Sequence, residues 1–117
     1  MQISLQEGEK LILELNANLM ARRQVVGGTL ILTDRRVIFE PRSLDLETGI
    51  IVIPLAQIAA IRAVNTLLLV PNGLLLQQEN GKQYRFAVEK RKVLMEELDK
   101  KKNAAQTREK EKGGREN

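Results

Sequence analysis

The chain has 117 residues, 43% of them hydrophobic, and a formal net charge of +4. This length predicts one domain with a core of its own. The absence of cysteine excludes disulfides and thiolate sites, and the absence of histidine removes the commonest general base and metal ligand. No glycine-rich phosphate loop precedes a helix. We therefore expect a protein that is not an enzyme and that uses no metal or cofactor.

The positive charge is unevenly distributed. Residues 1–88 carry nine Lys and Arg against eight Asp and Glu, whereas residues 89–117 carry ten against seven. No apolar stretch reaches the ~20 residues needed to span a bilayer, and the N-terminus has no apolar signal core. We expect a cytoplasmic protein, with peripheral binding to the inner face of a membrane as the further possibility that its basicity raises.

Alternating polarity predicts the first strands. Residues 1–10 are polar, with a turn expected at Gly8, and residues 11–19 alternate as a strand does. Residues 27–40 hold two alternating runs around a polar corner at 33–35, which predicts a β-hairpin with one buried face. The β-branched run at residues 50–53 predicts a strand rather than a helix, and its unbroken apolar character is compatible with burial on both faces.

The second half continues in the same way. A strand is predicted at residues 59–64, continuing through 67–70, and the Val-Pro-Asn-Gly sequence at 70–73 predicts a turn. Residues 74–78 and 83–88 then form two strands around Asn80-Gly81, a strong hairpin signal.

The pattern changes after residue 88. Strong helix formers with an apolar stripe predict an amphipathic helix over residues 89–102. Residues 103–117 are almost entirely polar and are predicted to be a disordered or marginally helical tail. About seven strands followed by one helix predict a mainly β domain over residues 1–102, curled into a barrel that the helix caps.

The order of these segments resembles the GRAM domain, a member of the pleckstrin-homology-like (PH-like) superfamily. The resemblance covers residues 5–102 and is carried by Gly28–Thr33, Arg36–Phe39, Ile53–Leu55 and Asn80–Phe86 with the helix that follows. It implies a seven-stranded antiparallel barrel, or two nearly orthogonal sheets, capped by one C-terminal α-helix. It also implies a non-catalytic module that binds a protein partner or an anionic lipid surface.

Four arginines are the candidate ligand-binding residues. In the resembled superfamily, the loop between the first two strands often binds lipid head groups, and Arg22 and Arg23 lie there. Arg36 and Arg42 could extend one basic rim, because guanidinium groups donate paired hydrogen bonds to phosphate. The alternative is that these side chains are solvated or pair with neighbouring carboxylates.

A leucine-rich segment at residues 67–76 is the candidate interface. Alternation requires some of its side chains to face away from a single core, where they could contact a partner or pack internally. This segment supports the alternative hypothesis of a homo- or hetero-oligomeric structural protein. Nucleic acid is not expected as a partner, because three aromatic residues leave little for base stacking. The candidate interface residues are Leu67, Leu68, Leu69, Val70, Leu74 and Leu75.

Overall fold

The computed structural model describes residues 3–22, 24–43, 49–66 and 70–115. Seven strands form one antiparallel sheet in the order β4-β3-β2-β1-β7-β6-β5, so β4 and β5 are its edges. A 25-residue helix, α1, follows the last strand. The elements in chain order are β1 (Leu11–Met20), β2 (Val25–Thr33), β3 (Arg36–Pro41), β4 (Ile51–Pro54), the 3₁₀ helix η1 (Leu55–Gln57), β5 (Ile58–Thr66), β6 (Val70–Gln78), β7 (Gln83–Val88) and α1 (Arg91–Arg115).

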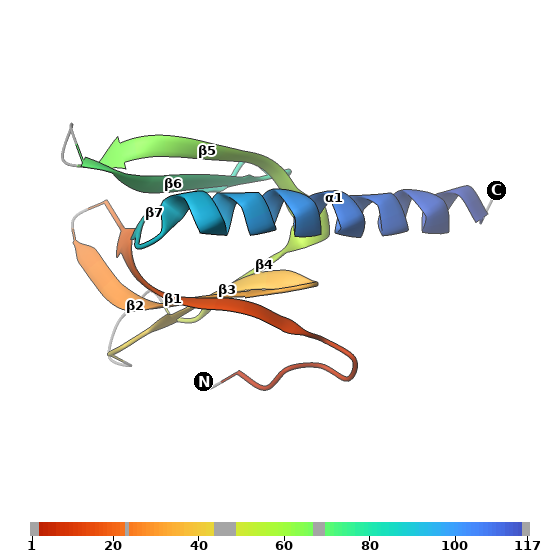
Figure 1. Ribbon diagram of the computed structural model, residues 1–117, viewed down its shortest axis with the longest axis horizontal. Helices are drawn as coiled ribbons and strands as arrows, with labels where there is room; N and C mark the ends of the chain where they lie inside the picture. Colours follow the sequence, from red (N-terminus) through yellow and green to blue (C-terminus); the bar gives the residue numbers. More distant parts are fainter. Residues whose placement is uncertain (1–2, 23, 44–48, 67–69, 116–117) are drawn as a thin grey trace.

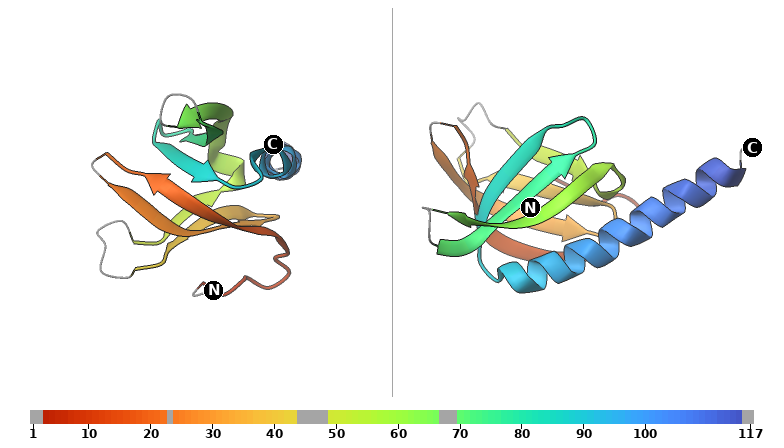
Figure 2. Two further views of the ribbon diagram at one scale, coloured as in Figure 1. Left: turned by 60° about the vertical axis from the view of Figure 1, so that its left-hand side comes forward. Right: turned by 90° about the horizontal axis from the view of Figure 1, so that it is seen from above.

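The sheet folds over into two layers, β1–β4 and β5–β7, and α1 lies along its open side (Figures 1 and 2). The two layers are joined where β1 pairs with β7, over Ala17–Leu19 and Phe86–Val88 only. The predicted mainly β fold of seven antiparallel strands and one C-terminal helix is confirmed. The sheet order is open rather than closed into a ring.

The core lies between the two layers and the helix. Phe39 of β3 and Phe86 of β7 are fully buried, with ring centroids 5.4 Å apart, so an aromatic pair connects the layers. Leu94 and Leu98 of α1 complete this core from the open side. Burial of apolar surface contributes roughly 25 cal/mol of stability per Å². The burial of these side chains is therefore the main force that holds the sheet and the helix together.

The outer face of the β2–β3 hairpin is also buried, and the prediction of a single buried face is wrong. Ile31 and Ile38 are completely inaccessible although they point away from the core. The segment before β1 accounts for this. It hydrogen-bonds to Arg36 and Glu40, which flank Ile38 on the same face, so it crosses over that residue.

The turn predicted at residues 70–73 is also wrong, because these residues belong to β6. Between the pairs Val64/Gly73 and Thr66/Val70, β6 has one more residue than β5, which makes a bulge. Proline is tolerated at a bulge, where no ladder donor is needed. Gly73 is required by close packing, since a Cβ there would lie 2.6 Å from the Val64 carbonyl oxygen.

Helix α1 runs to Arg115, so its predicted end at residue 102 is wrong. Residues 103–112 contain neither glycine nor proline and can continue the helix. Tertiary contacts also hold this part: Ala105 is buried, Gln106 donates to the Ile58 carbonyl, and Arg108 donates to the Asp34 carbonyl. At the other end of α1, Arg91 donates to the Val64 carbonyl. Helix α1 therefore contacts the edge strand β5 near both ends of that strand, at Ile58 and at Val64.

Candidate functional site

Three connections gather at one end of the molecule. The β1–β2, β3–β4 and β5–β6 connections all begin and end on the side where α1 starts, opposite the free end of the helix (Figures 1 and 2). We call this the loop end and define it by the described residues 20–22, 24–25, 41–43, 49–51, 66, 70 and 89–93.

Exposed aliphatic side chains are concentrated at the loop end. Val25 is 60% exposed at the start of β2, and Val70 is 40% exposed at the start of β6. Ile50 precedes β4 and Val93 lies in the first turn of α1, and both are exposed as well. Among the described residues, only Leu11 and Val52 are other large hydrophobic side chains with comparable exposure. Apolar side chains are therefore presented to solvent at one end.

Basic residues surround these side chains. Arg22 is exposed in the β1–β2 connection, and Lys90 and Lys92 are exposed where β7 passes into α1. Arg42 directly follows β3, and its backbone N–H donates to the Gly27 carbonyl, which places it beside the start of β2. Exposed aliphatic side chains with basic neighbours suit a binding surface that has negative charges at its boundary and an apolar layer beneath them.

The Arg42 side chain lies across the outer face of the sheet. A Cβ on Gly27 would come within 2.9 Å of its Nη1, so the missing side chain makes room for the guanidinium. Its Nη2 lies 3.5 Å from Asn16 Oδ1. A hollow of about 330 Å³ is lined here by Asn16, Asn18, Arg42, Asn72 and Glu89, among others. Glu89 accepts the Asn16 backbone N–H, which keeps its carboxylate turned toward β1.

The structure separates the four predicted arginines. Arg22 and Arg42 are both at the loop end, and Arg23 lies outside the described residues. Arg36 is engaged elsewhere: its Nε and Nη2 donate to the Glu9 carboxylate at 2.9 and 3.0 Å. The alternative of pairing with a carboxylate therefore describes Arg36, although its partner, Glu9, was not among the predicted ones.

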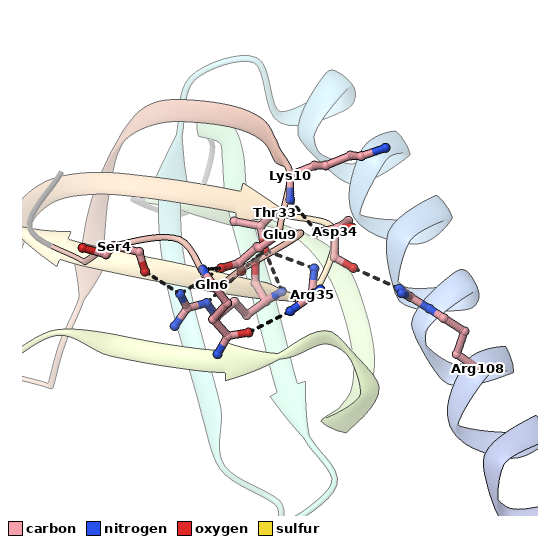
Figure 3. Close-up of polar contacts among 9 residues, drawn as sticks. Ser4, Gln6, Glu9, Lys10, Thr33, Asp34, Arg35 and Arg108 are labelled. Atoms are coloured by element: carbon pink, nitrogen blue, oxygen red, sulfur yellow. Dashed lines mark hydrogen bonds and ion pairs between the residues drawn. The ribbon is translucent and has the colours of Figure 1, made fainter.

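Glu9 is the centre of a buried polar cluster, drawn in Figure 3. Its carboxylate also accepts the Thr33 hydroxyl at 2.6 Å and the Gln6 backbone N–H at 2.8 Å. The hydrogen bonds from Arg36 lower the pKa of Glu9 from 4.5 to about 2, against the opposing effect of burial. These hydrogen bonds join Gln6 and Glu9 to Thr33 and Arg36, so the cluster fastens the segment before β1 to β2 and β3.

The predicted interface residues do not share one location in the structure. Leu67, Leu68 and Leu69 lie outside the described residues. Leu74 is completely buried in the core, whereas Val70 is exposed at the loop end. Leu75 is only 9% exposed and faces away from the core.

Of the exposed aliphatic residues at the loop end, the sequence predicted Val70 as an interface residue, whereas Val25, Ile50 and Val93 were missed. A signal was present at Val25, because Val25 and Val26 are adjacent in a strand and must face opposite sides. No such signal marks Ile50 or Val93, whose exposure depends on where the neighbouring elements lie. Among the described residues, no group of three acidic side chains is placed to hold a metal ion. No helix in the described part of the chain is long and apolar enough to cross a membrane.

Comparison with known proteins gives a family and a fold. The model of the GRAM domain matches residues 1–105. No curated protein matches the chain by sequence. Similar solved structures include the C-terminal domain of an unknown protein from Leishmania infantum, with a TM-score of 0.70 at 15% identity, covering 82% of this chain and 86% of that one.

Two further similar structures contain PH domains. The Vps36 N-terminal PH domain has a TM-score of 0.68 at 18% identity, over 89% of this chain and 86% of that one. The DH/PH domain of human ARHGEF11, crystallised in a ternary complex with human RhoA and its inhibitor, has a TM-score of 0.65 at 15% identity. That match covers 84% of this chain and 30% of the other. At these low identities, it is the TM-scores that show a fold shared with these PH domains.

Proposed function

The chain belongs to the GRAM domain family, and from this premise we propose that it is a non-catalytic binding module that docks its loop end on an anionic membrane surface. The observation that carries the proposal is the gathering of exposed aliphatic side chains and basic side chains at the same end. Val25 and Val70 would enter the boundary between head groups and acyl chains, while Arg22 and Arg42 would contact lipid phosphates.

The energetics favour a reversible association. Each basic residue near an anionic leaflet contributes about 1 kcal/mol, and each partly exposed valine adds only a fraction of the ~1.5–3 kcal/mol for full burial. Arg22, Arg42, Lys90 and Lys92 together then supply roughly 4 kcal/mol. We expect weak binding that is lost as salt screens the charges.

The fold sets the orientation. Because the free end of α1 lies opposite the loop end (Figure 1), the helix would project away from the membrane. The protein would then be peripheral at the inner face of a membrane, with the sides of the sheet accessible to other proteins. An acidic protein surface at the loop end is the competing partner, and the experiment below separates the two.

The test is co-sedimentation with vesicles of phosphatidylcholine alone or mixed with phosphatidylserine. The double variant Arg22→Gln/Arg42→Gln should bind the mixed vesicles roughly thirty-fold more weakly, as expected for about 2 kcal/mol. Arg62→Gln/Arg85→Gln is the matched control, because it removes the same charge from exposed arginines on another face of the sheet. The control should bind as the unmodified chain does.

If equal amounts of the unmodified chain sedimented with neutral and with mixed vesicles, membrane docking would be overturned. The loop end would then be a surface for a protein partner. Equal losses in the two double variants would show that net charge, rather than the loop end, determines binding.

A further inference from the structure

The outward side of β5, β6 and β7 is a second surface, distinct from the loop end. Alternation places Ile61, Leu74 and Phe86 toward the core, so their neighbours in the strands face outward. We call this surface the basic face and define it by its outward-facing residues Arg62, Leu75, Gln77, Gln83, Arg85 and Ala87.

Two arginines bracket one leucine on the basic face. Leu75 of β6 pairs with Arg62 of β5 on one side and with Arg85 of β7 on the other. Two strand spacings put the two arginine Cα atoms about 10 Å apart. Leu75 is only 9% exposed although it points away from the core, as expected for a leucine beneath the methylene stems of two arginines. Both arginines are exposed.

No carboxylate within these strands balances the two charges. The sequences of β5, β6 and β7 contain two arginines and neither aspartate nor glutamate. In the described part of the chain, Arg62 and Arg85 have no hydrogen bond or ion pair, whereas Arg36 binds Glu9 and Arg91 binds two backbone carbonyls. Like charges that flank a single residue repel weakly, so this arrangement favours an anionic partner.

The basic face does not suit a membrane or a nucleic acid. Its central leucine is nearly buried, so the face offers no large aliphatic side chain for insertion, in contrast to Val25 at the loop end. It carries only two cations, and Phe86 in β7 points into the core rather than outward to stack on bases. Carboxylates about 10 Å apart, a distance that two turns of an α-helix span, fit the two arginines.

We propose that the basic face is a docking surface for an acidic, helical segment of a partner protein, whose carboxylates pair with Arg62 and Arg85 on either side of Leu75. This interaction goes beyond membrane docking and stands without it. On a membrane-bound molecule, the basic face would lie at the side of the protein and remain accessible.

The experiment uses the full chain, isotope-labelled, and a designed alanine-rich helical peptide with glutamates two turns apart on one face. On addition of the peptide, the amide chemical shifts of residues around Leu75 should change. The fluorescence anisotropy of a labelled peptide should rise as the chain is added at low salt and give a measurable affinity. Arg62→Gln/Arg85→Gln should weaken binding by about ten-fold, in keeping with two exposed ion pairs. Arg62→Lys/Arg85→Lys should retain part of the binding, and Arg22→Gln/Arg42→Gln should retain all of it.

Three results would overturn the proposal. The first is the same shift changes with a control peptide in which glutamine replaces glutamate. The second is shift changes confined to the loop end. The third is loss of vesicle binding in Arg62→Gln/Arg85→Gln, since the face would then belong to the membrane site. Failure of the vesicle experiment with intact peptide binding would instead contradict membrane docking alone.

Discussion

Glu9 Oε2 lies 2.9 Å from Arg36 Nε, and this ion pair fastens the segment before β1 to the outer face of β3. The Glu9 side chain is completely buried and that of Arg36 is 14% exposed, so water screens the pair only weakly. The same segment crosses Ile38, which would otherwise face solvent. The polar cluster thus keeps this segment over Ile31 and Ile38, the buried apolar residues on the outer face of the β2–β3 hairpin.

Replacing Glu9 with glutamine should destabilise the protein by roughly 2–3 kcal/mol, because Arg36 would lose its charged partner in a buried position. Urea unfolding followed by far-UV circular dichroism measures the change. Glu14→Gln is the matched control: Glu14 is exposed in β1 and should change stability by less than about 0.5 kcal/mol. Equal stabilities of the two variants would contradict a structural role for the pair.

The pair also predicts a pH dependence. The pKa of Glu9 is about 2 in the folded protein and 4.5 in its ordinary state. A lowered folded pKa means that the stabilisation is fully present above about pH 4.5 and is lost as the pH falls toward 2. The difference in unfolding free energy between the unmodified chain and Glu9→Gln should therefore be constant near neutrality and shrink below pH 4.5. A difference that grows in acid would contradict this assignment.

Two adjacent glycines in β2 should respond differently to alanine. At Gly28 a Cβ would lie 2.3 Å from the Glu40 carbonyl oxygen and 2.7 Å from the Phe39 ring, so Gly28→Ala should destabilise the fold by more than ~2 kcal/mol. At Gly27 a Cβ would lie 2.9 Å from Arg42 Nη1 and 3.3 Å from Asn18 Oδ1, both at the far ends of side chains rather than in the backbone. Gly27→Ala should therefore melt near the unmodified temperature but bind anionic vesicles more weakly, because Arg42 is displaced. Thermal melts and co-sedimentation distinguish these outcomes.

Truncation tests the continuation of α1. A chain that ends at residue 102 loses buried Ala105 and the hydrogen bond from Gln106 to the Ile58 carbonyl, which together should cost about 1–3 kcal/mol. A chain that ends at residue 111 keeps both and should unfold at the same denaturant concentration as the full chain. If both truncations were equally stable, residues 103–111 would contribute nothing to the fold.

The strands could be predicted from the sequence because their alternation records which side faces the core. Leu30, Leu32 and Phe39 lie on the buried face, as their spacing indicates. The burial of Ile31 and Ile38 could not be predicted, because it depends on a polar segment distant in sequence. The Pro71-Asn72-Gly73 turn was wrong for a related reason: turn-forming residues also suit a bulge, and only the pairing of β5 with β6 distinguishes the two.

The candidate site was less predictable than the fold. Arg22 and Arg42 could be proposed from residue type, yet nothing local separates them from Arg36, whose partner Glu9 is 27 residues away in the chain. The helix end at residue 102 was misjudged because the polar sequence beyond it has no apolar stripe, and its contacts are made mainly through Gln106 and Arg108 to backbone carbonyls. Side-chain bonds of this kind leave no periodic signature.

The most direct test of membrane docking uses the absence of native cysteine, which allows single labels at chosen positions. Val25→Cys, Val70→Cys and Glu111→Cys would each carry an environment-sensitive fluorophore and be mixed with vesicles containing phosphatidylserine. We predict a blue shift and protection from aqueous quenchers at Val25 and Val70, with no change at Glu111 near the free end of α1. A blue shift at Glu111 without one at Val25 and Val70 would contradict the proposed docking through the loop end.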